Sequence, residues 1–539
     1  MLKLDLDTPR GRLIAHLGRI GLALAAGAGA ALAHPPFGLL LGLLGYPLLL
    51  LLAERSATTR GGFWMGWLAG FAYFFISCWW VAEAFLVNPE QAWMAPFAGA
   101  LLPSGLGLFW GAATALYRRF PVAGARRALV FAALFCLMEW LRGHVLTGFP
   151  WNPAGASWPA GGAASQLASL VGVYGLSFVT VAAVAAFAPL AGPGPMRSRA
   201  GAAALGAIAL AALVVGGALR LTRADVTFTD TVVRIVQADI AQESKWSPEA
   251  YAGIVRRYLN LTTRSGAVQP DIIIWPEGAL PAVANDIFAP GAVDGIAIAR
   301  AIQPGQSLIV GLGRAQQDAT VKGGPDAGWR YFNSAFLLTD QGGDGLKISA
   351  LYDKHRLVPF GEYLPAGDLL GALGVRSLTH TPLDFSPGPR PAPIKVPGAP
   401  AVQPLICYES LYPGFTPGGA DRPGWIVNIS NDAWFGRTSG PAQHLNLASY
   451  RAIETGLPIV RSTPTGVSAM IDPWGRVVGD QRLDPGESGV IDARVPQPGP
   501  MTLYGRLGDL PFALMVGAGL ILMPWRRVRL RRRKLSASS

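Results

Sequence analysis

The sequence predicts an integral membrane protein in which about eight transmembrane helices accompany one large globular α/β domain outside the cytoplasm. Hydrophobic residues make up 51% of the 539 residues and charged residues only 14%, whereas a soluble protein carries roughly a quarter of charged residues. Several apolar stretches are long enough to cross about 30 Å of hydrocarbon. A segment of ordinary globular composition, roughly 225–503, holds short strand-like runs and separates the last two of these stretches.

Eight apolar stretches are the expected membrane spans. They fall near residues 12–33, 37–53, 62–86, 93–117, 127–147, 164–191, 200–220 and 507–525. We therefore expect four parts along the chain, which are a transmembrane bundle (1–222), a globular domain (223–505), an eighth span (506–528) and a basic tail (529–539).

The basic residues gather in every second loop. They precede the first span, follow spans two, four and six, and form the run from Arg526 to Lys534 after the last span. Short cytoplasmic loops carry an excess of Lys and Arg, so we expect both termini in the cytoplasm and the globular domain on the opposite side. This distribution also accounts for the net charge of +12 without a nucleic-acid partner.

A cleaved secretory signal is the competing interpretation of the first span. The basic N-terminus, an apolar run and Ala31-Leu32-Ala33 imitate such a signal. Cleavage would remove the first span, and the alternation of basic loops would then fit only if the new N-terminus faced outside. We therefore expect the span to be retained.

Ionisable residues inside predicted spans are functional candidates by default. Glu83, Glu139 and Arg142 are the examples here. Glu139 and Arg142 are three residues apart, however, and can pair on one helix face. We therefore favour structural pairing over a transport role.

Three segments of the globular domain carry the residues suited to catalysis. Glu277 ends a short apolar strand, Lys354 lies in the polar segment 352–363, and Cys407 ends a second apolar strand. Catalytic side chains concentrate where strands lead into loops, because the sheet fixes the backbone while the loop exposes the side chain. The three residues are far apart in the sequence, so only the fold can bring them together.

These residue types fit acyl transfer through a thioester. A free cysteine is mostly protonated at neutral pH, and a carboxylate can accept its proton. An ammonium favours the thiolate and stabilises the oxyanion of the tetrahedral intermediate. Taken singly, Cys407 is more often a core residue and Lys354 a surface charge, and Glu277 is as often a helix cap as a catalytic group. Cys78 and Cys136 lie in apolar runs, so we expect no disulfide framework, metal site or cofactor.

Together the three segments resemble the Glu–Lys–Cys triad of the nitrilase (carbon–nitrogen hydrolase) superfamily. With the spans on both sides and the segments 148–152 and 431–436, nearly the whole chain is similar to the apolipoprotein N-acyltransferase family of the bacterial envelope. The resemblance implies an αββα sandwich for the globular domain. It also implies a place in the bacterial inner membrane, with this domain on the periplasmic side.

The resemblance implies roles for the matching residues. Glu277 would be the general base, Lys354 the cation that stabilises the oxyanion, and Cys407 the nucleophile. Four further residues match the family, namely Glu362, which would orient Lys354, Tyr408, whose backbone N–H would donate to the oxyanion, Glu409 beside it, and the substrate-contacting aromatic Trp246.

The resemblance further implies a ping-pong reaction. A phospholipid would give its sn-1 acyl chain to Cys407 and leave as a lysophospholipid. The α-amine of a diacylglyceryl-cysteine lipoprotein would then attack the thioester and become acylated. We therefore expect a phospholipid donor, a diacylated apolipoprotein acceptor and membrane lipid as partners, and a monomeric enzyme.

Two other functions remain open at this point. A membrane-tethered amidase or nitrilase would use the same triad but release its thioester to water, which calls for an open, wet pocket. A transporter or scaffold with an inert domain would be expected to lose a triad residue, and none is missing. The segment 364–389, rich in Leu, Gly and Pro, is either an ordinary loop or an apolar lid over an acyl chain.

Overall fold

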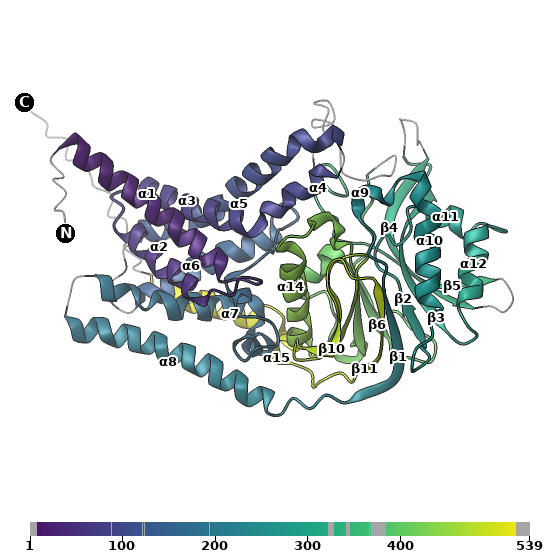
Figure 1. Ribbon diagram of the computed structural model, residues 1–539. Helices are drawn as coiled ribbons and strands as arrows, with labels where there is room; N and C mark the ends of the chain where they lie inside the picture. The colour runs from purple at the N-terminus through teal and green to yellow at the C-terminus, as the bar shows by residue number, and fades with distance from the viewer. Residues whose placement is uncertain are drawn as a thin grey trace, which may run out of the picture.

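A helical bundle and a layered α/β domain lie side by side in the computed structural model of the protein (Figure 1). The structure describes residues 8–523 except 88, 121, 123, 125, 193–194, 322–327, 341–344, 366 and 368–383. The predicted tail at 529–539 and most of the predicted lid at 364–389 therefore lie outside the described residues.

The bundle consists of apolar helices that follow the apolar stretches of the sequence. Among the described residues, five helical segments are long and apolar enough to cross a membrane. They are α1 (Pro9–Leu32), α3 with η2 and α4 (Thr59–Cys78, Trp79–Ala82, Glu83–Leu86), η3 with α5 (Pro89–Met94, Ala95–Arg119), η5 with α7 and η6 (Ala164–Leu167, Ala168–Ala185, Ala188–Ala191), and α8 (Met196–Leu221).

The predicted number of eight spans is not confirmed, because three of the stretches form shorter or more charged helices. The stretch near 37–53 is divided between η1 (Leu40–Leu44) and α2 (Gly45–Glu54), and the last stretch forms α16 (Leu510–Ile521). The fifth stretch forms α6 (Arg126–His144), whose 19 residues include several charged groups. Hydropathy alone does not show where a helix ends inside an apolar stretch.

The charged pair inside α6 is structural, as its spacing indicates. Arg142 Nη2 lies 3.9 Å from Glu139 Oε1, and both side chains are buried. The Glu139 carboxylate accepts the backbone N–H of Ala154 at 3.2 Å, and Arg142 donates to the carbonyl of Trp151 at 2.9 Å. The pair therefore holds the chain that follows α6 against the bundle.

The α/β domain contains two sheets packed face to face. The first has the strand order β11-β1-β2-β3-β4-β5 and the second β10-β9-β8-β7-β6. The first sheet comprises β1 (Phe228–Gln237), β2 (Ile272–Ile274), β3 (Ser307–Gln317), β4 (Trp329–Asp340), β5 (Leu346–Asp353) and β11 (Gly489–Pro496). The second comprises β6 (Val402–Ile406), β7 (Trp425–Ile429), β8 (Ile459–Ser462), β9 (Ser468–Ile471) and β10 (Val477–Leu483).

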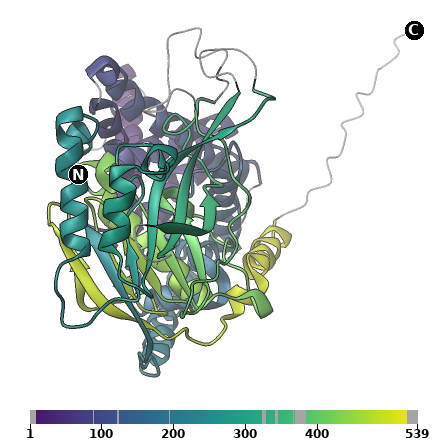
Figure 2. The same ribbon diagram turned by 90° about the vertical axis from the view of Figure 1, so that its right-hand side faces the viewer.

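Alternation along the strands produces the layers. Ile272 and Ile274 of β2 pack into the core between the two sheets, whereas Ile273 packs into the core on the outer face, as a period of two requires. The helices α10 (Pro248–Thr262) and α12 (Val293–Ala301) cover that outer face (Figures 1 and 2). With α14 (Gly440–Thr455) on the other side, the predicted αββα sandwich is confirmed.

Helix α14 lies between the second sheet and the bundle (Figure 1). All but two of its 16 residues are buried, because it packs against partners on both sides. Tyr450 donates to the carbonyl of Gly155 at 3.0 Å, and Glu454 accepts the backbone N–H of Val173 at 2.8 Å. These hydrogen bonds dock the domain onto the bundle in one orientation.

The buried pair in α6 gives a stability prediction. Arg142→Met leaves the Glu139 carboxylate buried without its cation, so we expect a loss of about 3–5 kcal/mol and a lower melting temperature in detergent. The double variant Glu139→Gln/Arg142→Met removes both charges and should recover part of this loss. Equal losses in the single and double variants would contradict the assignment.

Candidate active site

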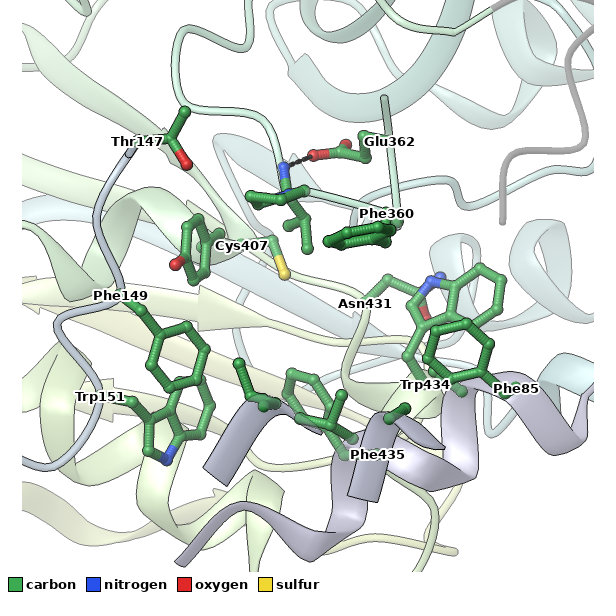
Figure 3. Close-up of a pocket in the computed structure, with 18 of the residues that line it drawn as sticks. Phe85, Thr147, Phe149, Trp151, Phe360, Glu362, Cys407, Asn431, Trp434 and Phe435 are labelled. Atoms are coloured by element: carbon green, nitrogen blue, oxygen red, sulfur yellow. Dashed lines mark hydrogen bonds between the residues drawn. The ribbon is translucent and has the colours of Figure 1, made fainter. Parts of the chain in front are cut away.

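Cys407 lies at a strained turn between a strand and a helix. It directly follows β6 and begins the short 3-10 helix η7 (Cys407–Leu411), with a backbone φ of 48°. For a non-glycine residue this conformation costs on the order of 1–3 kcal/mol, and such strain concentrates at functional sites. The turn places the Cys407 thiol at the wall of a cavity (Figure 3).

Glu277 reaches the same cavity from the facing sheet. It lies three residues beyond β2, and the neighbouring strand β3 carries Gly311 where the two backbones approach closely. A Cβ atom at Gly311 would lie 2.5 Å from the Glu277 Cα and 2.8 Å from the carbonyl oxygen of Pro276. A glycine is therefore needed at this position if Glu277 is to stay in place.

Lys354 links two carboxylates. Its Nζ lies 3.1 Å from Glu277 Oε1 and 3.0 Å from the Glu362 carboxylate, and its side chain is buried. The amide of Asn333, on β4, donates to Glu277 at 2.6 Å and to Glu362 at 2.7 Å. The structure thus brings together the three residues predicted from separate segments and adds Asn333, which the sequence analysis missed.

The second oxygen of Glu277 is available as a proton acceptor. Glu277 Oε2 is buried and has no hydrogen-bond partner within the described part of the chain. Cys407 lines the same cavity and interacts electrostatically with Glu277 and Lys354. An uncompensated carboxylate oxygen beside a thiol is the arrangement that general-base catalysis requires.

The protonation states of the site follow from burial and from these charges. Burial and the Glu277 charge raise the pKa of the Cys407 thiol to about 12, and Lys354 opposes this shift without overcoming it. Burial by itself would lower the pKa of Lys354, but Glu277 and Glu362 outweigh it and the pKa rises. The resting site therefore holds a thiol and an ammonium. Lys354 lowers the pKa of the Cys407 thiol, as expected of a neighbouring ammonium, but burial and the Glu277 charge outweigh it, so deprotonation requires a base.

Glu409 connects the catalytic loops and does not line the cavity. Its fully buried carboxylate accepts hydrogen bonds from the backbone N–H groups of Ile406 at 2.8 Å and His355 at 2.8 Å, and from the Tyr352 hydroxyl at 2.6 Å. It thereby ties the turn that carries Cys407 to the loop that carries Lys354. The other predicted neighbour, Tyr408, lines the cavity and donates to Gly148 of the bundle at 2.8 Å.

A buried network of polar side chains contacts the backbone of Cys407. His444 Nε2 lies 3.2 Å from the Cys407 carbonyl oxygen, and His444 Nδ1 lies 2.9 Å from Asp432 Oδ1. Asp432 in turn forms an ion pair with Arg461 at 2.7 Å. Contacts on both ring nitrogens give His444 a packed, structural role beside the nucleophile.

Trp246, the aromatic residue expected to contact substrate, lines the cavity, and 39% of it is exposed. The residue before it, Lys245, was not predicted as part of the site. Lys245 is buried, lines the same cavity and donates a hydrogen bond to the carbonyl of Gly278. Burial lowers its pKa to about 8, although Glu277 opposes the shift.

The cavity continues from the triad to the membrane helices. It has a volume of about 1430 Å³ and is lined at one end by Glu277, Lys354 and Cys407. Near Cys407 its wall is aromatic, with Phe149, Trp151, Trp434 and Phe435 around the sulfur (Figure 3). It is also lined by residues of η3 and α5, which are Trp93, Phe97, Leu101, Gly105, Leu108 and Phe109.

The raised thiol pKa predicts slow alkylation of Cys407. Because the thiol is protonated well below pH 12, we expect iodoacetamide to react with a rate that rises about tenfold per pH unit up to pH 10. Lys354→Met should slow the reaction, and Glu277→Gln should accelerate it at a given pH, since the Glu277 charge opposes thiolate formation. Peptide mass spectrometry with Cys407→Ser as the blank measures this, and a plateau near pH 8 would contradict it.

Comparison with known proteins identifies the family over nearly the whole chain. Residues 26–186 match the apolipoprotein N-acyltransferase N-terminal domain, and residues 232–499 match the carbon–nitrogen hydrolase family. An apolipoprotein N-acyltransferase of Caulobacter vibrioides is 49% identical over 526 residues, covering 96% of each chain. Those of Bradyrhizobium diazoefficiens and Rhodopseudomonas palustris are 39% and 37% identical, covering 94% of this chain and 95% of theirs.

Proposed function

Because the chain belongs to the apolipoprotein N-acyltransferase family, we propose that Cys407 carries an acyl chain from a phospholipid to the α-amine of a diacylated lipoprotein. The protein is a membrane N-acyltransferase with a nitrilase-like domain that acts in lipoprotein maturation. The assignment of individual residues and of the two substrates rests on the geometry of the site.

The first half-reaction loads the cysteine. Glu277 Oε2 takes the proton of the Cys407 thiol while the sulfur attacks the carbonyl carbon of the sn-1 ester. Lys354 and the backbone N–H of Tyr408 stabilise the oxyanion, and one such donor contributes about 3–4 kcal/mol. When the intermediate collapses, the C–O bond breaks and the leaving alkoxide takes the proton from Glu277. The products are a Cys407 thioester and a lysophospholipid.

The second half-reaction unloads the cysteine onto an amine. The neutral α-amine attacks the thioester carbon, and Glu277 accepts one of its protons. The C–S bond breaks, and the proton passes from Glu277 to the Cys407 sulfur. The enzyme returns to its resting thiol, and the lipoprotein carries a new amide.

The continuity of the cavity is the observation that carries this proposal. One continuous cavity is lined both by the triad and by apolar residues of η3 and α5, in a segment long and apolar enough to cross a membrane. A fatty chain is stabilised by about 0.8 kcal/mol for each methylene it buries there. The competing hydrolase would need water at the thioester, whereas the cavity wall near Cys407 is aromatic (Figure 3), which favours a lipid substrate over water.

We propose the orientation and the domain boundaries on the same basis. The basic loops support cytoplasmic termini, with the domain at 223–505 on the periplasmic side of a bacterial inner membrane. Both substrates then lie in the leaflet beside the catalytic domain. The bundle at 1–222 and the span at 506–528 would hold the cavity at lipid depth.

A covalent adduct tests the proposed function. We expect intact-mass analysis of the detergent-purified protein, incubated with phosphatidylethanolamine, to show one added fatty acyl group that hydroxylamine removes. The adduct should be absent in Cys407→Ser, since an alcohol at this position lacks the acidity and nucleophilicity of the thiol. An adduct that persists in this variant, or maps to another residue, would sink the mechanism.

The cavity wall gives a second prediction about the acyl chain. Gly105 lines the cavity, and a Cβ added there meets open space. Gly105→Leu should therefore fold normally, but its side chain should displace about three methylenes of the bound acyl chain. Each displaced methylene loses about 0.8 kcal/mol of burial energy. We expect kcat/KM to fall roughly 50-fold with a palmitoyl donor and little with an octanoyl donor.

A matched control separates this effect from a general effect of leucine in a membrane helix. Gly201, in α8, also has open space around it but does not line the cavity. Gly201→Leu should leave both donors unaffected. Equal losses for long and short donors in Gly105→Leu would rule out an acyl site at this wall.

A further inference from the structure

Asn431 is a buried polar residue beside Cys407. The parallel strands β6 and β7 pair with Ile406 opposite Ile429, so the residues that follow them leave the sheet at the same edge. Cys407 comes directly after β6, and Asn431 lies two residues after the end of β7. Both side chains line the same cavity, and Figure 3 shows Asn431 and the Cys407 sulfur on it.

The carbonyl oxygen of the Asn431 side chain lacks a hydrogen-bond donor. Asn431 is 6% exposed, and its Oδ1 is buried with no hydrogen-bond partner among the residues that the structure describes. Its Nδ2 is held by Gln242 Oε1 at 3.2 Å, which fixes the direction of the amide. A buried acceptor without a partner costs about 1–3 kcal/mol, and a substrate group that donates a hydrogen bond would recover this.

The chemistry of the two half-reactions indicates which substrate group that is. The ester carbonyl and ester oxygen of a phospholipid have no N–H or O–H to donate. The attacking amine has two N–H bonds when neutral, and its product amide keeps only one of them. Glu277 Oε2, the other buried oxygen without a partner in the described cavity wall, receives the proton that leaves, so the remaining N–H needs a separate acceptor.

The cavity also favours the neutral form of an amine. Lys354 is charged and Lys245 lies on the same wall, and both cations disfavour a further ammonium. The burial that lowers the pKa of Lys245 to about 8 acts in the same direction on an entering α-amine. A neutral amine has a free lone pair, which must still be aimed at the thioester carbon.

We propose that Asn431 Oδ1 binds the attacking α-amine of the acceptor and orients it, so that Asn431 is a catalytic residue of the second half-reaction only. In this step the N–C bond forms and the C–S bond breaks. One amine proton passes to Glu277 and then to the Cys407 sulfur, while the N–H that Asn431 holds stays on the amide product. The inference rests on the proposed function and adds the acceptor site to it.

Separate measurement of the half-reactions tests this inference. Asn431→Leu keeps the size of the side chain but removes the acceptor oxygen, whereas Asn431→Asp keeps an oxygen acceptor at the same place. The Cys407 thioester is first formed from phosphatidylethanolamine and followed by intact mass. A synthetic peptide with an N-terminal diacylglyceryl-cysteine is then added, and the decay of the thioester is timed against amide formation.

We expect Asn431→Leu to form the thioester within about threefold of the wild-type rate and to transfer it roughly 30- to 100-fold more slowly, comparable to the loss of one oriented hydrogen bond in other active sites. Asn431→Asp should restore most of the transfer rate. Hydrolysis of the thioester without peptide should be similar in all three proteins.

Three results would overturn the inference. These are unchanged transfer in Asn431→Leu, an equal slowing of both half-reactions, which would show a structural role, and transfer in Asn431→Asp as slow as in Asn431→Leu. A wild-type protein that forms no thioester at Cys407 would instead refute the proposed function itself, and the acceptor site with it.

Discussion

The ion pair of Lys354 with Glu277 and Glu362 is the interaction on which the catalytic site depends. A charged lysine without partners cannot be buried to this extent, and the two carboxylates satisfy it. The Asn333 amide donates to both carboxylates and holds them in place. This arrangement commits one oxygen of Glu277 to Lys354 and leaves the other without a hydrogen-bond partner among the residues that the structure describes. The carboxylate that balances the Lys354 charge is therefore also the one proposed as general base.

The membrane bundle positions the site as well as anchoring it. The Glu139–Arg142 pair holds the chain after α6, and Tyr408, next to Cys407, donates to Gly148 of that chain. Helix α14 is buried between the domain and the bundle. Residues of both parts line the cavity that contains Cys407. Movement of the bundle relative to the domain would therefore change the shape of this cavity.

A single cavity must serve two substrates of different chemistry. Its apolar end on η3 and α5 suits an acyl chain, and its polar end holds Glu277, Lys245, Lys354 and Asn431. The raised pKa of the Cys407 thiol keeps the cysteine unreactive until Glu277 takes its proton. The aromatic side chains that line the cavity near Cys407 give the thioester an apolar surrounding, which disfavours attack by water.

The sequence by itself determined the class of the protein and the positions of the triad. Apolar stretches, loop charges and strand-end residues are local features, and Glu277, Lys354 and Cys407 lie in segments that are recognisable on their own. Tertiary structure alone decided where helices such as α6 end, that Glu409 ties two loops together, and that Asn333, Lys245 and Asn431 face the cavity. Those roles arise from contacts between distant segments, because an Asn or Lys in the sequence shows nothing of the partner it will meet or lack after folding.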